Sequence, residues 1–119
     1  MLPLVFPAIA TTAVKAIVGT SPVRIYRHGQ APESAVRPYI TWFVVTGTPQ
    51  DSLTTPCADI DTVQIDCWSD DDTQVETLAS AVRDALDAAL TTNTVILNTF
   101  ESETKLYRIG LQADFIKSR

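Results

Sequence analysis

The sequence of 119 residues has few of the residue types that build catalytic and metal sites. It contains two cysteines, one histidine and four glycines. A structural zinc site takes four cysteine or histidine ligands, and these residues are too few to supply them. The glycines are isolated from one another, so no glycine-rich phosphate-binding loop is present. No motif typical of an enzyme is found.

The single histidine, His28, lies near Arg24 and Arg27 and could serve as a base or a phosphate contact. No nucleophile motif such as G-x-S-x-G accompanies it. The simpler interpretation is an exposed or edge-strand histidine.

Positive charge is also scarce. Nine lysines and arginines stand against fourteen aspartates and glutamates, which gives a net charge of −5. The basic residues are scattered, so nucleic acid would meet net repulsion. Direct binding of nucleic acid is therefore disfavoured. An acidic surface along which nucleic acid passes without binding is compatible with the composition.

Long hydrophobic runs are missing. The apolar segment 1–19 lacks a charged beginning, contains Pro3 and Pro7, and is broken before the roughly 20 apolar residues of a membrane-spanning helix. We expect it to form a helix of the soluble fold, with no membrane contact. Without an export signal, Cys57 and Cys67 are expected to be reduced thiols in a cytosolic setting.

The remaining composition, 45% hydrophobic and 19% charged, is that of a globular protein. Apolar residues spaced by three and four predict helices over residues 7–18 and 75–90. Apolar runs and alternation predict strands around residues 23–28, 39–45, 60–68, 93–103 and 104–116. We therefore predict a single α+β domain, 1–119, with a mainly antiparallel sheet and two helices packed on one face. Residues 30–38 are predicted to form a loop, and 46–59 a longer one with a functional role.

Five aspartates lie between residues 61 and 72. Ser69 or Asp70 at the N-cap, with Asp71 and Asp72 in the first turn of the second long helix, would satisfy free backbone N–H groups and the helix dipole. The alternative is a divalent-ion site in which Asp66 joins Asp70 or Asp72, as in a metal-dependent hydrolase. Because no calcium-loop spacing is present, capping is the preferred interpretation.

Four stretches together resemble a known family. They are LPLVFPAI, VRIYRHGQAPESAVRPYITW, VQIDCWSDDDTQVETLASAVRDAL and YRIGLQADF. In this order they resemble the small tail-completion, or tail-terminator, proteins of long-tailed bacteriophages and prophages. The resemblance covers most of the chain and omits mainly the loop 46–59 and the turn before Lys105.

The resemblance implies a non-enzymatic virion protein that needs no cofactor or metal. It would form a homo-oligomeric, hexameric ring on the head-proximal end of the tail tube, stop tube polymerisation and provide the surface to which the head docks. Its partners would be the tail-tube protein and head–tail connector proteins, with DNA only passing through the lumen. It would be found in the virion tail, and in the host cytoplasm during assembly. A neck or head–tail joining protein is the nearest alternative, and a peptide-binding module is another.

Two segments are candidates for contacts between subunits or with the tube. The apolar segment 39–45 could supply an edge strand or apolar patch for association. The loop around Pro49 to Pro56 is long enough to extend to the tube or to the neighbouring subunit. The candidate residues are Tyr39, Trp42, Val44, Pro49, Asp51, Leu53 and Pro56.

Overall fold

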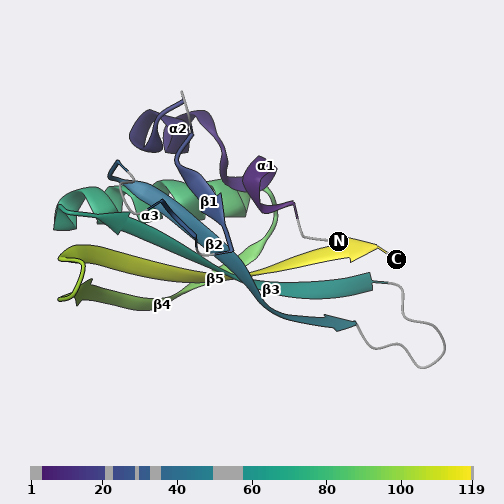
Figure 1. Cartoon of the computed structure of the whole chain (residues 1–119). Coiled ribbons are helices and arrows are strands. Elements are labelled where there is room, and N and C mark those ends of the chain that lie inside the picture. Colours follow the sequence, from purple (N-terminus) through teal and green to yellow (C-terminus); the bar gives the residue numbers. More distant parts are fainter. Residues whose placement is uncertain (1–3, 21–22, 29, 33–35, 50–57, 119) are drawn as a thin grey trace.

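The residues that the structure describes form one five-stranded sheet and three helices (Figure 1). The structure, a computed structural model, describes residues 4–20, 23–28, 30–32, 36–49 and 58–118. In chain order the elements are α1 (Val5–Ile9), α2 (Thr12–Val18), β1 (Ile25–Arg27), β2 (Tyr39–Pro49), β3 (Ala58–Ser69), α3 (Asp72–Ala88), β4 (Thr92–Glu101) and β5 (Leu106–Ser118).

The strand order in the sheet is β1-β2-β3-β5-β4. Only β1 and β2 are parallel, and the other three pairings are antiparallel. Helix α3 packs on β3, β4 and β5, while α1 and α2 pack against α3. Helices α1, α2 and α3 therefore lie on one face of the sheet (Figure 1), and the predicted α+β class is confirmed.

The core lies between α3 and the helix-side face of the sheet. Alternate residues of β3, namely Val63, Ile65 and Cys67, are fully buried and stand opposite the buried residues of β5. Burial, with a smaller contribution from the charge of Asp66, raises the pKa of the Cys67 thiol far above its usual value. Cys67 is therefore an inert packing residue, and Cys57 lies outside the described residues.

The single N-terminal helix predicted over residues 7–18 is divided in two. Helix α1 ends at Ile9, and Thr11 caps α2 with its Oγ1, which accepts a hydrogen bond of 3.4 Å from the N–H of Val14. A threonine hydroxyl that bonds to the backbone favours an N-cap over a helix interior. The apolar periodicity continues through the break because both helices bury their apolar residues in the same core.

The predicted bounds of the loop, residues 46 and 59, are both wrong. Strand β2 continues to Pro49 and β3 begins at Ala58, with Thr46 opposite Thr62 and Pro49 opposite Asp59. Threonines favour extended backbone, and the proline stands at the end of its strand, where it is tolerated. Residues 50–57 lie outside the described part of the chain.

Helix capping explains Asp71 and Asp72 at the start of α3, although the N-cap is not one of the two predicted residues. Asp71 is the N-cap of α3, and its Oδ1 accepts hydrogen bonds from the N–H groups of Thr73 (2.8 Å) and Gln74 (3.2 Å). The hydroxyl of Ser69 is occupied elsewhere, because it donates to Oε1 of Gln74 (2.7 Å) and accepts from the N–H of Asp71 (3.1 Å). Asp72 lies in the first turn, as predicted.

Within the described residues, no helix has the length and apolar character needed to cross a membrane.

The Asp71→Ala substitution should lower the free energy of unfolding by about 1 kcal/mol, because it removes the carboxylate that satisfies two free N–H groups. Chemical denaturation followed by circular dichroism measures the change. The matched control is Asp70→Ala, which removes an exposed neighbour outside the cap. Equal losses in the two variants would refute the capping role of Asp71.

Candidate functional site

The aspartates of the possible metal site do not form one. Asp66 is buried on the sheet face opposite the helices, where its carboxylate accepts hydrogen bonds from Nη2 of Arg108 and from Nε2 of Gln64, both at 3.0 Å. Asp70 and Asp72 are exposed at the start of α3. Among the described residues, no three acidic, histidine or cysteine side chains are grouped in a way that could hold a metal ion. The structure therefore does not support the hydrolase alternative.

The helix-free face of the sheet carries a row of side chains, one from each strand. From β1 to β4 the row, named here the transverse row, consists of Tyr26, Tyr39, Trp68, Arg108 and Glu101. The rings of Tyr26 and Tyr39 meet edge to face at 6.1 Å, and those of Tyr39 and Trp68 stack at 6.1 Å. The guanidinium of Arg108 lies 5.0 Å from the Trp68 ring centroid, and its Nη1 donates to Glu101 at 3.0 Å. Side-chain contacts thus connect all five strands.

The transverse row is anchored on Asp66. The Asp66 side chain is only 3% exposed and that of Arg108 22% exposed. Burial alone would lower the pKa of Arg108, but its hydrogen bonds to Asp66 and Glu101 outweigh burial and raise it. An added Cβ at Gly110 would lie 2.9 Å from Oδ1 of Asp66, so a glycine is needed beneath this pair. The pair is therefore a structural element of the sheet.

The predicted contact residues are divided between the two faces. Tyr39 lies in the transverse row, half-buried, and burial is the main cause that raises its pKa. Trp42 is buried in the core, and Val44 packs against that core from a partly buried position. Pro49 ends β2, whereas Asp51, Leu53 and Pro56 lie outside the described residues. Their role in contacts stays a prediction.

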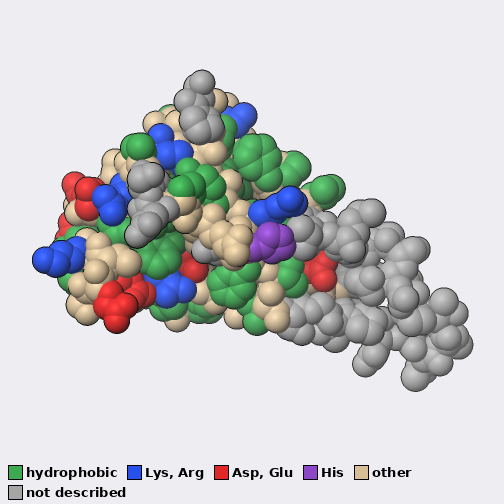
Figure 2. All heavy atoms as spheres, viewed as in Figure 1, with side chains coloured by type: hydrophobic (Ala, Val, Ile, Leu, Met, Phe, Trp, Pro, Cys, Tyr) green, Lys and Arg blue, Asp and Glu red, His purple; other side chains and the backbone are tan. Residues whose placement is uncertain are grey.

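His28 is exposed just after β1 and stacks on Trp42 at 6.4 Å. Figure 2 shows this histidine on the face in view, beside basic and hydrophobic side chains. Its exposure agrees with the simpler interpretation of an edge-strand histidine.

Strands β2, β3 and β5 continue past the helices as a three-stranded arm (Figure 1). The arm comprises residues 46–49, 58–62 and 116–118, with Ile60 paired to both Thr48 and Ile116. Strand β1 pairs only with Ile40–Trp42. From Phe43 to Pro49, β2 therefore has no strand on that side among the described residues, and its edge can accept another strand.

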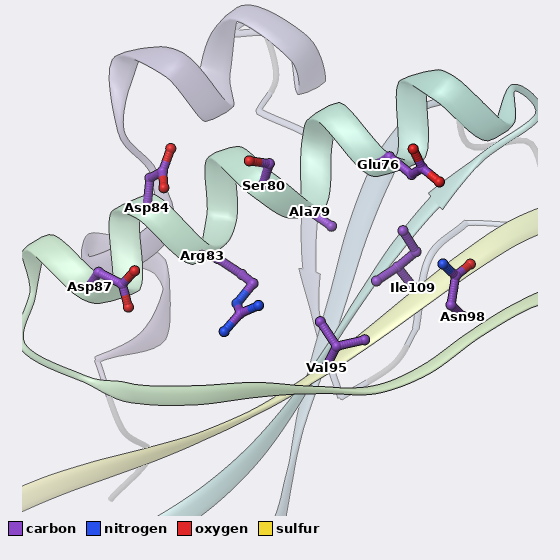
Figure 3. Close-up of a pocket in the computed structure, with 9 residues that line it drawn as sticks. All are labelled: Glu76, Ala79, Ser80, Arg83, Asp84, Asp87, Val95, Asn98 and Ile109. Carbon is purple, nitrogen blue, oxygen red and sulfur yellow. The ribbon is translucent and has the colours of Figure 1, made fainter.

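A groove of about 520 Å³ runs between α3 and the edge strand β4 (Figure 3). Its helix wall carries Glu76, Asp84 and Asp87 around Arg83. Arg83 donates from Nε to Oδ1 of Asn93, and Nδ2 of Asn93 donates to Oδ1 of Asp87, each at 2.8 Å. The groove therefore has an excess of negative charge. Sequence reasoning missed it, although an uncharged run from Thr92 to Phe100 was the available signal.

Two β-bulges present exposed apolar side chains at the edges of the sheet. The register shifts at Val45 in β2 and at Ile96 in β4. These side chains are 53% and 42% exposed. Bulges commonly redirect a side chain at a sheet edge, so both residues are available for contact with another chain.

The Arg108→Met substitution should lower the free energy of unfolding by about 3 kcal/mol, because it leaves the buried Asp66 carboxylate without its partner. Adding Asp66→Asn to this variant should recover part of the loss. Arg83→Met, at an exposed arginine, is the control and should cost less than about 1 kcal/mol. Urea denaturation measures all three, and an equal loss for the two arginines would contradict the anchoring role of Arg108.

The chain matches the family described as Tail completion protein gp17 over residues 5–116. Its fold is similar to that of a chain in the solved structure titled "Virion of native gene transfer agent (GTA) particle", with a TM-score of 0.74 and 17% sequence identity over 98% of this chain and 96% of that chain. No curated protein sequence gives a significant match.

The family match extends from the first residue of α1 into β5 and so includes the transverse row, the groove and both bulges. The similarity to the virion chain shows the same fold along nearly the whole length of both chains. This protein belongs to the Tail completion protein gp17 family and is a phage tail-completion protein.

Proposed function

We propose that this protein is a tail terminator, which forms a ring on the head-proximal end of the tail tube. The ring stops tube polymerisation and offers the surface to which the filled head docks. Membership in a tail-completion family supports a role in finishing the tail. The finer assignment, to the tube end rather than to the neck, rests on the arm.

The arm is the observation that carries this proposal. It extends beyond the helical layer and leaves the β2 edge from Phe43 to Pro49 without a strand partner in the described residues. A strand edge of this kind binds another protein through main-chain hydrogen bonds. If the arm binds the last tube subunits, the rest of the protein covers the end of the tube. Because it differs from a tube subunit, no further tube subunit would bind, and polymerisation would end.

The two unlike edges of the sheet support the proposed ring. Strand β1 forms one edge and β4 the other. Contacts between two different surfaces of identical subunits are heterologous, and they close into a ring when the rotation between neighbours closes. Six subunits is the number that the family resemblance implies. The net charge of −5 suits a lumen through which DNA passes without being held.

The proposed function needs no chemistry from the protein. Asp66 is engaged by Arg108 and Gln64, and Asp71 is engaged by the backbone of α3. These acidic groups therefore have structural tasks. The protein would act in the assembling virion inside the host cell and remain in the tail.

Deletion of the gene from the parent phage should give overlong tails of irregular length, because the tube would lack its cap. Electron microscopy of the lysate measures tail length, with a plasmid copy of the gene as the control that restores it. Tails of normal length that fail to join heads would assign the protein to the neck instead. Normal infectious particles would refute both virion functions.

The Leu53→Asp substitution should also give overlong tails, because Leu53 is the one leucine in the segment between β2 and β3 and is our candidate for an apolar contact with the tube. The control is Ser52→Asp, which adds the same charge at the adjacent position. Electron microscopy of complemented lysates gives tail lengths, and thermal unfolding verifies that both variants are folded. Normal tails with folded Leu53→Asp protein would exclude this contact.

A further inference from the structure

The β4 edge of the sheet has the properties of a protein-binding edge. Strand β4 has ten residues, of which only the last, Glu101, is charged. Val95, Ile96 and Phe100 are each more than 40% exposed. A long, uncharged edge strand with exposed apolar side chains pairs readily with another chain unless something covers it. Nothing covers β4 among the described residues.

The same edge is acidic on its helix side. Glu76 and Asp84 line the groove between α3 and β4, both are exposed, and neither forms an ion pair within the described part of the chain. Arg83 offsets only part of this charge, because Asp87 lines the groove as well (Figure 3). An occupant of the groove should therefore carry positive charge next to apolar surface.

The opposite edge of the sheet, formed by β1, combines positive charge with apolar surface. Arg27 ends β1 and is exposed, and Arg37, also exposed, precedes β2. Arg37 lies two residues before Tyr39, whose ring contacts Tyr26 of β1, so both arginines lie at this edge. Neither arginine forms an ion pair among the described residues. Figure 2 shows basic side chains next to hydrophobic ones on the face in view.

The apolar parts of the two edges also correspond. On the β1 side, Val36 is 64% exposed and Val45 is exposed at its bulge. On the β4 side, Ile96 is exposed at its own bulge. Each edge thus presents an exposed branched apolar residue together with charge of one sign, and the sign differs between the edges.

We propose that the acidic α3–β4 edge of one copy of this chain binds the basic β1-side edge of the next copy, with Glu76 and Asp84 facing Arg27 and Arg37. This interface rests on the proposed ring and defines which surfaces close it. A second copy is the occupant that the structure favours, because this chain itself carries the complementary charge and apolar residues. Pairing of two β4 edges is disfavoured, because it would oppose like charges.

Two charge-reversed proteins test the interface. The first carries Glu76→Lys and Asp84→Lys, so both of its edges are basic. The second carries Arg27→Glu and Arg37→Glu, so both of its edges are acidic. Each protein alone should fail to assemble, since like charges would meet at every interface and raise the apparent Kd between subunits at least about tenfold. Mixed together, the two should alternate around the ring and assemble.

The variants are expressed singly and together in cells infected with the gene-deleted phage, and tail length is measured by electron microscopy. Each variant alone should give overlong tails, and co-expression should restore normal length. A control with Asp70→Lys and Glu103→Lys changes the net charge by the same amount as the first variant, away from the groove lining, and should cap normally. Thermal unfolding of the purified proteins establishes that all variants are folded.

Normal tails with either variant alone, or no restoration by the pair, would overturn the interface. Failure of only the first variant would mean that the α3–β4 edge meets a surface other than the β1-side edge. These outcomes are separate from failure of the terminator function, in which the gene deletion itself leaves tail length unchanged. In that event, sedimentation of the purified variants, alone and mixed, tests whether the proposed interface forms. Only the mixture should form a larger species.

Discussion

The burial of Asp66 on the uncovered face of the sheet is the constraint on which much of this structure depends. A buried carboxylate is costly unless a charged partner and hydrogen bonds compensate it. Arg108 from β5 and Gln64 supply both, and Arg108 also holds Glu101 of β4. Gly110 is required beneath the pair because a side chain there would meet Asp66. Two ion pairs that share Arg108 therefore connect three neighbouring strands, β3, β5 and β4.

In the described part of the chain all helices cover one face, so the other face has to remain ordered without a second layer there. The transverse row provides this order, since its rings and guanidinium are in contact from β1 to β4. Side-chain contacts of this kind stabilise a sheet through cross-strand pairs. These contacts hold the two edges of the sheet in place relative to one another, as the proposed ring would require.

The sequence was sufficient to predict the elements that depend on local periodicity. The stripe of α3, the alternation of β3 and β5 and the α+β class follow from apolar spacing. The N-cap could not be assigned uniquely, because three consecutive aspartates and Ser69 all have suitable side chains. The transverse row and the α3–β4 groove depend on strand order, which places residues far apart in sequence side by side. Periodicity contains no information on that order.

Strand order also bears on whether the proposed ring would be favoured over a symmetric pair. The chain places its short parallel strand at one edge and its long antiparallel strand at the other. The arginines near β1 and the acidic groups of α3 are thereby separated across the sheet. Two copies that meet through identical edges would oppose like charges, whereas unlike edges attract. Charge separation across the sheet would therefore favour the heterologous contacts of the proposed ring over contacts between identical edges.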